Sequence, residues 1–162
     1  MKAPRKILFK AKRLDNGEWI EGYYFEDYGN HTIISNIPDE DPTSFTKYPI
    51  YRVDPTTLSQ FTGWKDSHGN KIFENDIVEI VSTSKTSYKY LIWWNREMSM
   101  MEAVLLDGIS CNGTDYYNHT NKSRDYETFC LMLQDPWGDF KDIKVIGNIF
   151  DNPELVEDKI NE

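Results

Sequence analysis

The segment at residues 61–81 (FTGWKDSHGNKIFENDIVEIV) constrains the fold most, because it joins two turn signals to a buried-strand signal. Residues 66–70 (DSHGN) form a dense turn signal, in which Gly69 can take a positive φ without steric cost. A second break at residues 74–76 (END) leads into the apolar run at residues 77–81 (IVEIV). Tight turns that feed a strand buried on both faces are typical of a small β-barrel. The segment therefore predicts turn chemistry and not an active site.

Three segments resemble the YopX family, whose members are small proteins encoded by phages and prophages. Residues 62–78 (TGWKDSHGNKIFENDIV) are similar to the family stretch TGLKDKNGKEIYEGDIV, with Trp64 in place of Leu and Asn75 in place of Gly. Residues 145–155 (VIGNIFDNPEL) are similar to its closing VIGNIYENPEL, and residues 6–11 resemble its first strand more loosely. Asn is the next best residue after Gly for a left-handed conformation. The resemblance implies a phage or prophage origin and a family without an assigned activity.

The composition and the resemblance together predict a mainly β protein. The chain has 10 Tyr, 8 Phe and 5 Trp, and aromatic residues favour strands. We expect an N-terminal β-hairpin layer at residues 1–59, packed on a small SH3-like β-barrel at residues 60–150. The barrel carries a long loop insertion near residues 107–142. A short C-terminal helix is expected within residues 151–162, with Pro153 at its first position.

Local signals predict several elements of the N-terminal layer. Residues 7–25 read as a β-hairpin, closed by a type I′ turn at Asp15-Asn16-Gly17. A third strand is expected at residues 31–37 and an extended segment at residues 48–53. One helical turn is expected to start at Pro55.

The charge distribution is uneven. The net charge is −9, yet the first 13 residues contain six basic side chains and no acidic one. An acidic protein repels nucleic acid at long range, which disfavours a nucleic-acid partner, although a basic strand could contact phosphates. No apolar run approaches the ~20 residues of a membrane span, and the basic start lacks the apolar core of a signal peptide. We expect no membrane association and a location in the cytoplasm of a bacterial host.

Metal and nucleophile patterns are weak. Cys111 and Cys130 lack a CxxC spacing, and a zinc site with His119 would still need a fourth ligand. The scattered His31 and His68, like His119, are expected to be exposed polar residues. The sequence contains no nucleophile elbow, P-loop or dinucleotide-binding motif. We therefore predict no cofactor, no metal and no enzyme activity.

Carboxylates offer the main enzymatic alternative. Glu74 and Asp76 lie two residues apart, with Asp66 across the turn, and such a trio could bind a divalent cation for hydrolysis. The competing interpretation is structural, because Asp side chains beside turns cap backbone N–H groups. The positions assigned to structural turn motifs are Gly63, Asp66, Gly69, Asp76, Gly147 and Pro153.

Aromatic side chains are the candidate binding residues. Trp93 and Trp94 are expected on opposite faces of one strand, so that one packs in the core and the other lies at the surface. Trp64, Tyr116 and Tyr117 could complete a platform for bases or a peptide groove. The predicted function is a phage or prophage accessory protein that binds a host or phage protein without catalysis. The alternatives are a self-assembling, homo-oligomeric β-barrel protein, a metal-dependent hydrolase and a single-stranded nucleic-acid binder.

Overall fold

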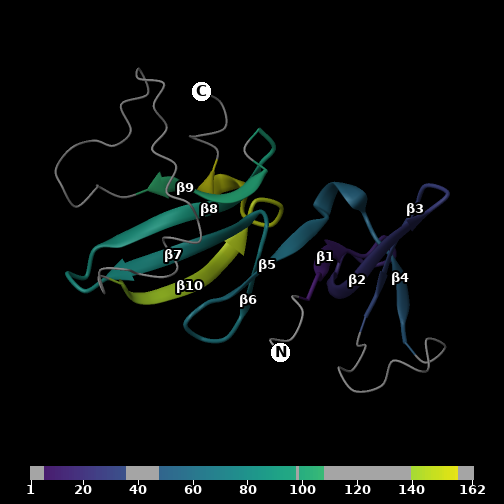
Figure 1. Ribbon diagram of the computed structural model, residues 1–162, viewed down its shortest axis with the longest axis horizontal. Coiled ribbons are helices and arrows are strands. Elements are labelled where there is room, and N and C mark those ends of the chain that lie inside the picture. The colour runs from purple at the N-terminus through teal and green to yellow at the C-terminus, as the bar shows by residue number, and fades with distance from the viewer. Residues whose placement is uncertain (1–5, 36–47, 98, 108–139, 157–162) are drawn as a thin grey trace. The chain divides into compact units, whose positions relative to one another are not determined.

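The fold is mainly β, as predicted. The structure, a computed structural model, describes residues 6–35, 48–97, 99–107 and 140–156 (Figure 1). Their strands form two antiparallel sheets, and the helical segments in those ranges are short 3-10 turns. The chain divides into two compact units, Met1–Trp64 and Lys65–Glu162. In the described ranges, no helix is long and apolar enough to span a membrane.

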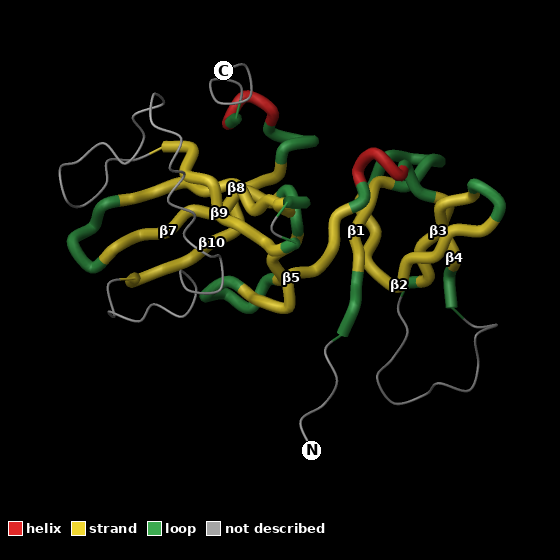
Figure 2. The backbone as a smooth tube through the Cα atoms, turned by 45° about the horizontal axis from the view of Figure 1, so that its top comes forward, coloured by secondary structure: helices red, strands yellow, loops and turns green. Residues whose placement is uncertain are grey.

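The longest strand of the first unit, β2 (Trp19–Asp27), pairs with two other strands. The elements of this unit are β1 (Phe9–Lys12), β2 (Trp19–Asp27), β3 (Asn30–Ile34), β4 (Ile50–Arg52), the 3-10 turn η2 (Pro55–Thr57) and β5 (Ser59–Lys65), which runs across the unit boundary. The first part of β2 pairs with β1, and its second part pairs with β3. The order of these strands in the sheet is β4-β3-β2-β1-β5, and β1 also pairs with β5. The predicted helical turn at Pro55 is confirmed as η2, one of the two red segments in Figure 2.

The core of the first unit lies on one side of these strands. Ala11, Ile33 and Val53 are almost fully buried there, and four half-buried side chains pack against them: Phe9, Ile20, Tyr24 and Leu58. Gly22 lies where β2 passes from one partner strand to the other. A Cβ at this position would come within 1.9 Å of the Ile34 carbonyl oxygen, so only glycine fits.

The type I′ turn occurs in a different hairpin from the predicted one. At Asp15-Asn16-Gly17 only Gly17 has a positive φ, and the wider turn is closed by the Gly17 N–H bound to the Arg13 carbonyl. Between β2 and β3, Tyr28 and Gly29 have φ values of 45° and 77°, and Asp27 pairs directly with Asn30. Positive φ at both central residues is the signature of type I′. The prediction was wrong because Asn-Gly favours a type I′ turn without imposing it. The pairing of the flanking strands decides the length of the turn.

The second unit contains an open sheet. Its elements are β6 (Lys71–Phe73), β7 (Asp76–Ser82), β8 (Ser87–Asn95), β9 (Met100–Asp107), β10 (Phe140–Asn148) and the 3-10 turn η3 (Pro153–Leu155). Four of these strands form a sheet in the order β10-β7-β8-β9 (Figure 1). The predicted SH3-like barrel at residues 60–150 is therefore not observed in the described part of the chain, where β9 and β10 are the two edges of this sheet and do not pair with each other. The predicted loop insertion lies largely outside the described residues, since residues 108–139 are not described.

The C-terminal helix also needs correction. Pro153 does occupy the first position of a helical segment, but this segment is the single 3-10 turn η3, and Asn152 makes no side-chain capping bond to it. Val156, directly after η3, is buried against Ile77, Leu91 and Leu106. The turn therefore covers one face of the sheet in the second unit without extending into an α-helix within the described residues.

Candidate functional site

The turn at residues 66–70 is organised by the Asp66 carboxylate. Asp66 is only 6% exposed, and its Oδ1 accepts the backbone N–H groups of His68 (2.9 Å) and Asn70 (2.8 Å). Its Oδ2 accepts the Asn70 amide (3.0 Å) and the Val145 N–H on β10 (3.2 Å). Burial alone would raise the pKa of Asp66, but these hydrogen bonds outweigh it and hold the pKa below its usual value. Asp66 thus caps the backbone of this turn, and Gly69 within it has a positive φ of 88°.

The two segments that carry the family resemblance meet in space. Ser67 donates its N–H to the Ile143 carbonyl (2.9 Å), and its Oγ accepts the Ile143 N–H (2.9 Å). Asn75, with φ of 66°, donates its N–H to Ile92 and accepts the Ile149 N–H through its carbonyl. Asn75 thus takes the left-handed conformation expected where the family has Gly. The first turn motif and the closing segment are one structural assembly around β7 and β10.

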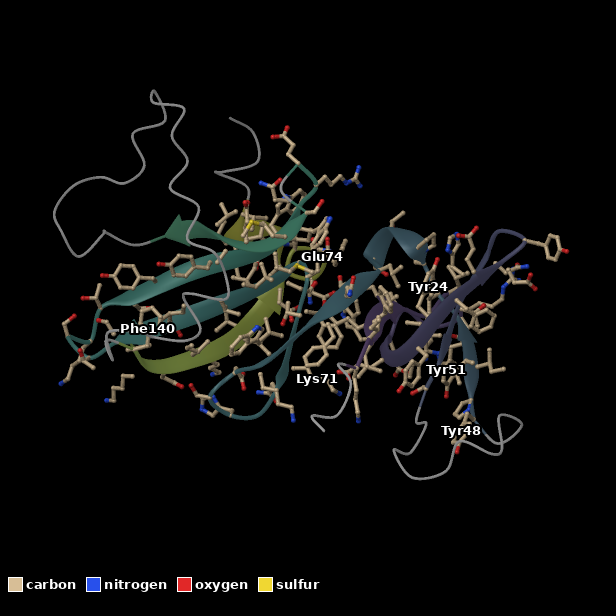
Figure 3. The ribbon with its side chains drawn as sticks, viewed as in Figure 1. Tyr24, Tyr48, Tyr51, Lys71, Glu74 and Phe140 are labelled. Carbon is tan, nitrogen blue, oxygen red and sulfur yellow. The ribbon has the colours of Figure 1, made fainter. Side chains whose placement is uncertain are left out.

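The carboxylate trio does not form a metal site. In the described ranges, no group of three His, Cys, Asp or Glu side chains is arranged to hold a metal ion. Asp76 is 1% exposed, and its Oδ2 accepts the Phe73 N–H at 2.8 Å, which caps the turn before β7. Glu74, labelled in Figure 3, is half-buried in the same turn. Asp66 and Asp76 therefore act on backbone groups, as the structural interpretation predicted.

The closing turn depends on a close approach of two residues. A Cβ at Gly147 would lie 2.2 Å from Oδ1 of Asn152, the residue before Pro153. Asn148 is buried, and its Oδ1 accepts the N–H groups of Phe150 and Asp151. Gly147 therefore lies at the closing turn, and Pro153 begins the 3-10 turn that follows it. Gly63 has φ of 92° within β5, a conformation that also favours glycine.

The two tryptophans of β8 are both exposed. Trp93 and Trp94 are 46% and 37% exposed, so the prediction that one of them packs in the core was wrong. The β7 ladder on β8 stops at Leu91, and within the described residues Trp93 and Trp94 pair only with β9. The sheet is two strands wide at this end, which leaves little to cover either indole. Trp64 is half-buried at the end of the first unit, and Tyr116 and Tyr117 lie outside the described residues.

A second aromatic surface lies in the first unit and was not predicted. Tyr23 (41% exposed) and Phe25 (40% exposed) lie on the same side of β2, because they are two residues apart. Their row continues across the sheet, since Tyr23 pairs with Ile34 and Ile34 pairs with Ile50, which is 59% exposed. We call Tyr23, Phe25 and Ile50 the outer apolar face. The sequence at residues 23–25 is Tyr-Tyr-Phe, without alternation of apolar and polar residues, so it carries no signal for this face.

A shallow groove adjoins this face at β4. Its volume is about 330 Å³, and it is lined by Leu14, Asp15, Ile50, Tyr51 and Arg52. The Arg13 guanidinium lies 4.2 Å from the centre of the Tyr51 ring, a cation–π contact. Tyr51 is labelled beside β4 in Figure 3. The groove therefore combines aliphatic, aromatic and cationic side chains.

Tyr28 is the most exposed large hydrophobic side chain among the described residues. It is 99% exposed, and it occupies the first central position of the type I′ turn between β2 and β3. That position favours Gly, Asn or Asp, and an L-residue with a bulky side chain loses about 1–2 kcal/mol in the left-handed region. The side chain therefore opposes the local fold and contributes nothing to the core.

The basic N-terminal segment is partly engaged with an indole. Lys10 and Lys12 place their ammonium groups 5.0 Å and 5.6 Å from the centre of the Trp19 ring. Glu21 pairs across the strands with Lys10, and it shares the side of β2 that carries Tyr23. Acidic and basic side chains thus alternate on this surface.

The histidines and cysteines have separate environments. His68 is exposed as predicted, but His31 is half-buried, with its Nδ1 2.6 Å from the Tyr24 hydroxyl, so the prediction for His31 was wrong. Burial, and secondarily Glu26, raises the pKa of Tyr24. Cys111, Cys130 and His119 lie outside the described residues.

The comparisons with known proteins bear on the two turn segments described above. The family model described as YopX protein matches residues 8–157, which is most of the chain and includes both segments. No curated protein matches the chain. In this chain the two segments are joined by hydrogen bonds, including those from Val145 to Asp66 and from Ile149 to Asn75. By this match the chain belongs to the YopX family.

Proposed function

We propose that this protein is a non-enzymatic binding protein of phage or prophage origin that recognises a host or phage protein in the bacterial cytoplasm. The observation that carries the proposal is Tyr28, a fully exposed aromatic side chain held in an unfavourable backbone conformation. A residue that strains its turn and is almost fully exposed among the described residues is not accounted for by stability. Such outliers concentrate at sites of function.

The outer apolar face supports a protein partner. Tyr and Phe are enriched in protein interfaces, and together with Arg they supply many of the anchoring contacts. The β2–β3 hairpin carries Tyr23 and Phe25 along its length and Tyr28 at its tip. The groove beside Ile50 adds a concave neighbour of mixed polarity.

Charge disfavours nucleic acid at the same surface. Glu21 and Asp27 lie on the side of β2 that carries Tyr23 and Phe25, because they occupy alternate positions of the same strand. The whole chain has a net charge of −9. Phosphate groups would meet these carboxylates as well as the basic Lys10 and Arg52 on the same side, and the net negative charge of the chain would slow their approach.

The proposal is tested with Tyr28→Asn. Asn tolerates the left-handed region better than Tyr. The unfolding free energy of the variant should therefore equal that of the wild type or exceed it by up to ~1 kcal/mol. In a tagged pull-down from expressing or infected cells, it should lose most of a stoichiometric partner protein that the wild type retains. Increased stability with reduced capture would separate a binding role from a structural one. Unchanged capture would remove Tyr28 from the interface.

Two double variants locate the interface. Tyr23→Ser with Phe25→Ser tests the outer apolar face, and Trp93→Ala with Trp94→Ala tests the exposed indoles of the second unit. Loss of capture only with the first pair supports the proposal, whereas loss only with the second moves the interface to β8. A high 260/280 nm absorbance ratio that falls after nuclease treatment would contradict a protein partner and favour nucleic acid.

A further inference from the structure

We propose that β9 is an open sheet edge at which a second copy of this chain adds its own β9, antiparallel, so that two four-stranded sheets become one. The inference begins with the two edges of the sheet in the second unit, β10 and β9. An exposed edge presents unpaired N–H and C=O groups to any other strand, and proteins normally block such edges. Here the two edges differ in how they are blocked.

The β10 edge carries several blocking features. Its register on β7 shifts twice, between Phe140 and Asp142 and between Val145 and Gly147. Its outward backbone groups are already used, since Ile143 bonds Ser67 in both directions and the Val145 N–H bonds Asp66. β10 also carries three charged side chains, those of Lys141, Asp142 and Lys144. Bulges, charges and a covering turn are the recognised means of preventing strand addition.

Within the described residues, the centre of the β9 edge carries no register shift and no covering turn, and Glu102 is its only charged residue. Among the described residues β9 pairs only with β8. The register of the two strands shifts once, near the end of β9, where Lys89 pairs with Asp107 but Tyr90 pairs with Leu105. Its sequence, MMEAVLLD, contains no Lys, Arg, Pro or Gly. Every second residue of an edge strand directs its N–H and C=O away from its partner strand. A long, regular, apolar edge of this kind favours pairing with another strand.

The one charge in the middle of β9 does not block the edge. Glu102 is 3% exposed, and its Oε1 accepts the side-chain amide of Asn95 on β8 at 2.8 Å. The carboxylate is therefore directed back toward the sheet and buried. A buried acid satisfied within its own sheet exerts little repulsion on an approaching strand.

The self-complementary chemistry of β9 favours a second copy over a different partner. A twofold axis perpendicular to the sheet at Ala103 makes the two strands antiparallel, which is the isologous contact of a C2 dimer. This register places Glu102 opposite Val104 of the partner subunit, and Met100 opposite the partner's Leu106. No two carboxylates face each other, and the apolar side chains form cross-strand pairs. The proposal concerns the second unit and is independent of the binding role assigned to the first.

The test combines mass and hydrogen exchange on the full chain. Light scattering after size exclusion should give twice the monomer mass at high concentration. Amide exchange in residues 100–106 should slow about tenfold or more as the protein is concentrated, because alternate N–H groups become bonded in the dimer. Exchange in β10 should not depend on concentration.

Two matched variants complete the design. Met101→Lys places a charge on the proposed edge at a half-buried position, and Val145→Lys makes the same change at a half-buried position of β10. The first should be monomeric, and the second should dimerise like the wild type. Circular dichroism confirms that each variant is folded; if Met101→Lys is unfolded, the exchange measurement on the wild type decides alone.

Three results would overturn the inference. The first is a wild type that remains monomeric at every concentration. The second is protection of the β9 amides that is equal at all dilutions, which would mean that the edge is covered within one chain. The third is a dimer that Val145→Lys dissociates and Met101→Lys does not.

Discussion

Replacing Asp66 by Asn tests whether the turn motif stabilises the second unit. The substitution keeps the shape and one acceptor oxygen of the side chain. It removes the charge and places an NH₂ group where Oδ2 now accepts the Val145 N–H and the Asn70 amide. The Val145 N–H and the Asn70 amide, which are both donors, would then face the NH₂ group of the new side chain, which is also a donor. Because Asp66 is 6% exposed, water has little access to replace the lost acceptor.

The expected loss is about 2–3 kcal/mol of unfolding free energy. A hydrogen bond to a charged group contributes about 1.5–3 kcal/mol, and a buried donor left without an acceptor costs about 1–3 kcal/mol. Asn70 is exposed and can turn its amide to water, so its bond is counted only in part. The Val145 N–H remains on β10 without an acceptor, and it dominates the estimate.

The assay is urea unfolding at pH 7, followed by circular dichroism. Asp54→Asn is the matched control, because Asp54 is also a turn aspartate and its Oδ1 accepts the Thr56 N–H and hydroxyl. Asn caps a helical turn as well as Asp does, so the control should change stability by only a few tenths of a kcal/mol. If both variants lose the same small amount, the reasoning about Asp66 is wrong.

The pH dependence gives a second, independent result. The folded-state pKa of Asp66 lies below its unfolded value of about 3.9, so its contribution is present above about pH 4 and is lost as the pH falls through the lower folded pKa. The stability difference between wild type and Asp66→Asn should therefore be constant near neutrality and shrink below about pH 4. A difference that grows on acidification would refute the assignment.

Substitutions at Asn75, Gly147 and Gly22 test the backbone. Asn75→Ala should lose about 1–2 kcal/mol in urea unfolding, because φ is 66° there, while Asn75→Gly should be close to neutral. Gly147→Ala should lose about 1–3 kcal/mol in the same assay, since its Cβ would overlap Oδ1 of Asn152, and Asn152→Ala in the same chain should restore part of the loss. Gly22→Ala should cost more than Gly147→Ala, because its Cβ meets the Ile34 backbone, and broadened amide signals in the first unit by NMR would register the damage. Equal effects at Gly22 and Gly147 would contradict this ranking.

Features that depend on neighbouring residues were predictable from the sequence. Asp66 and Asp76 cap turns, Gly69 and Asn75 take positive φ, and Pro55 begins a helical turn, because each depends on interactions a few residues apart. Turn signals and alternating apolar residues also gave the mainly β class.

Features that depend on distant pairing were not predictable. Whether a sheet closes depends on which strands meet at its edges, and β10 joins β7 from more than fifty residues away in the chain. The burial of Trp93 and Trp94 depended on where the β7 ladder stops, which no local pattern records. The turn at Tyr28 was not predicted, because the central positions of a type I′ turn favour Gly, Asn or Asp over Tyr. The residue that departs from this preference is the one that carries the binding proposal.

The bonds between residues 66–67 and β10 have a consequence for synthesis of the chain. They span 76 and 79 positions, and β7 lacks its β10 neighbour until residues 140–148 have left the ribosome. During that interval β7 is an apolar strand with one bare flank, and the Asp66 carboxylate has no Val145 amide to bind. A premature stop before residue 140 would make this interval permanent. Such truncated products should aggregate or be degraded even though the turns at residues 66–70 and 74–76 have been translated.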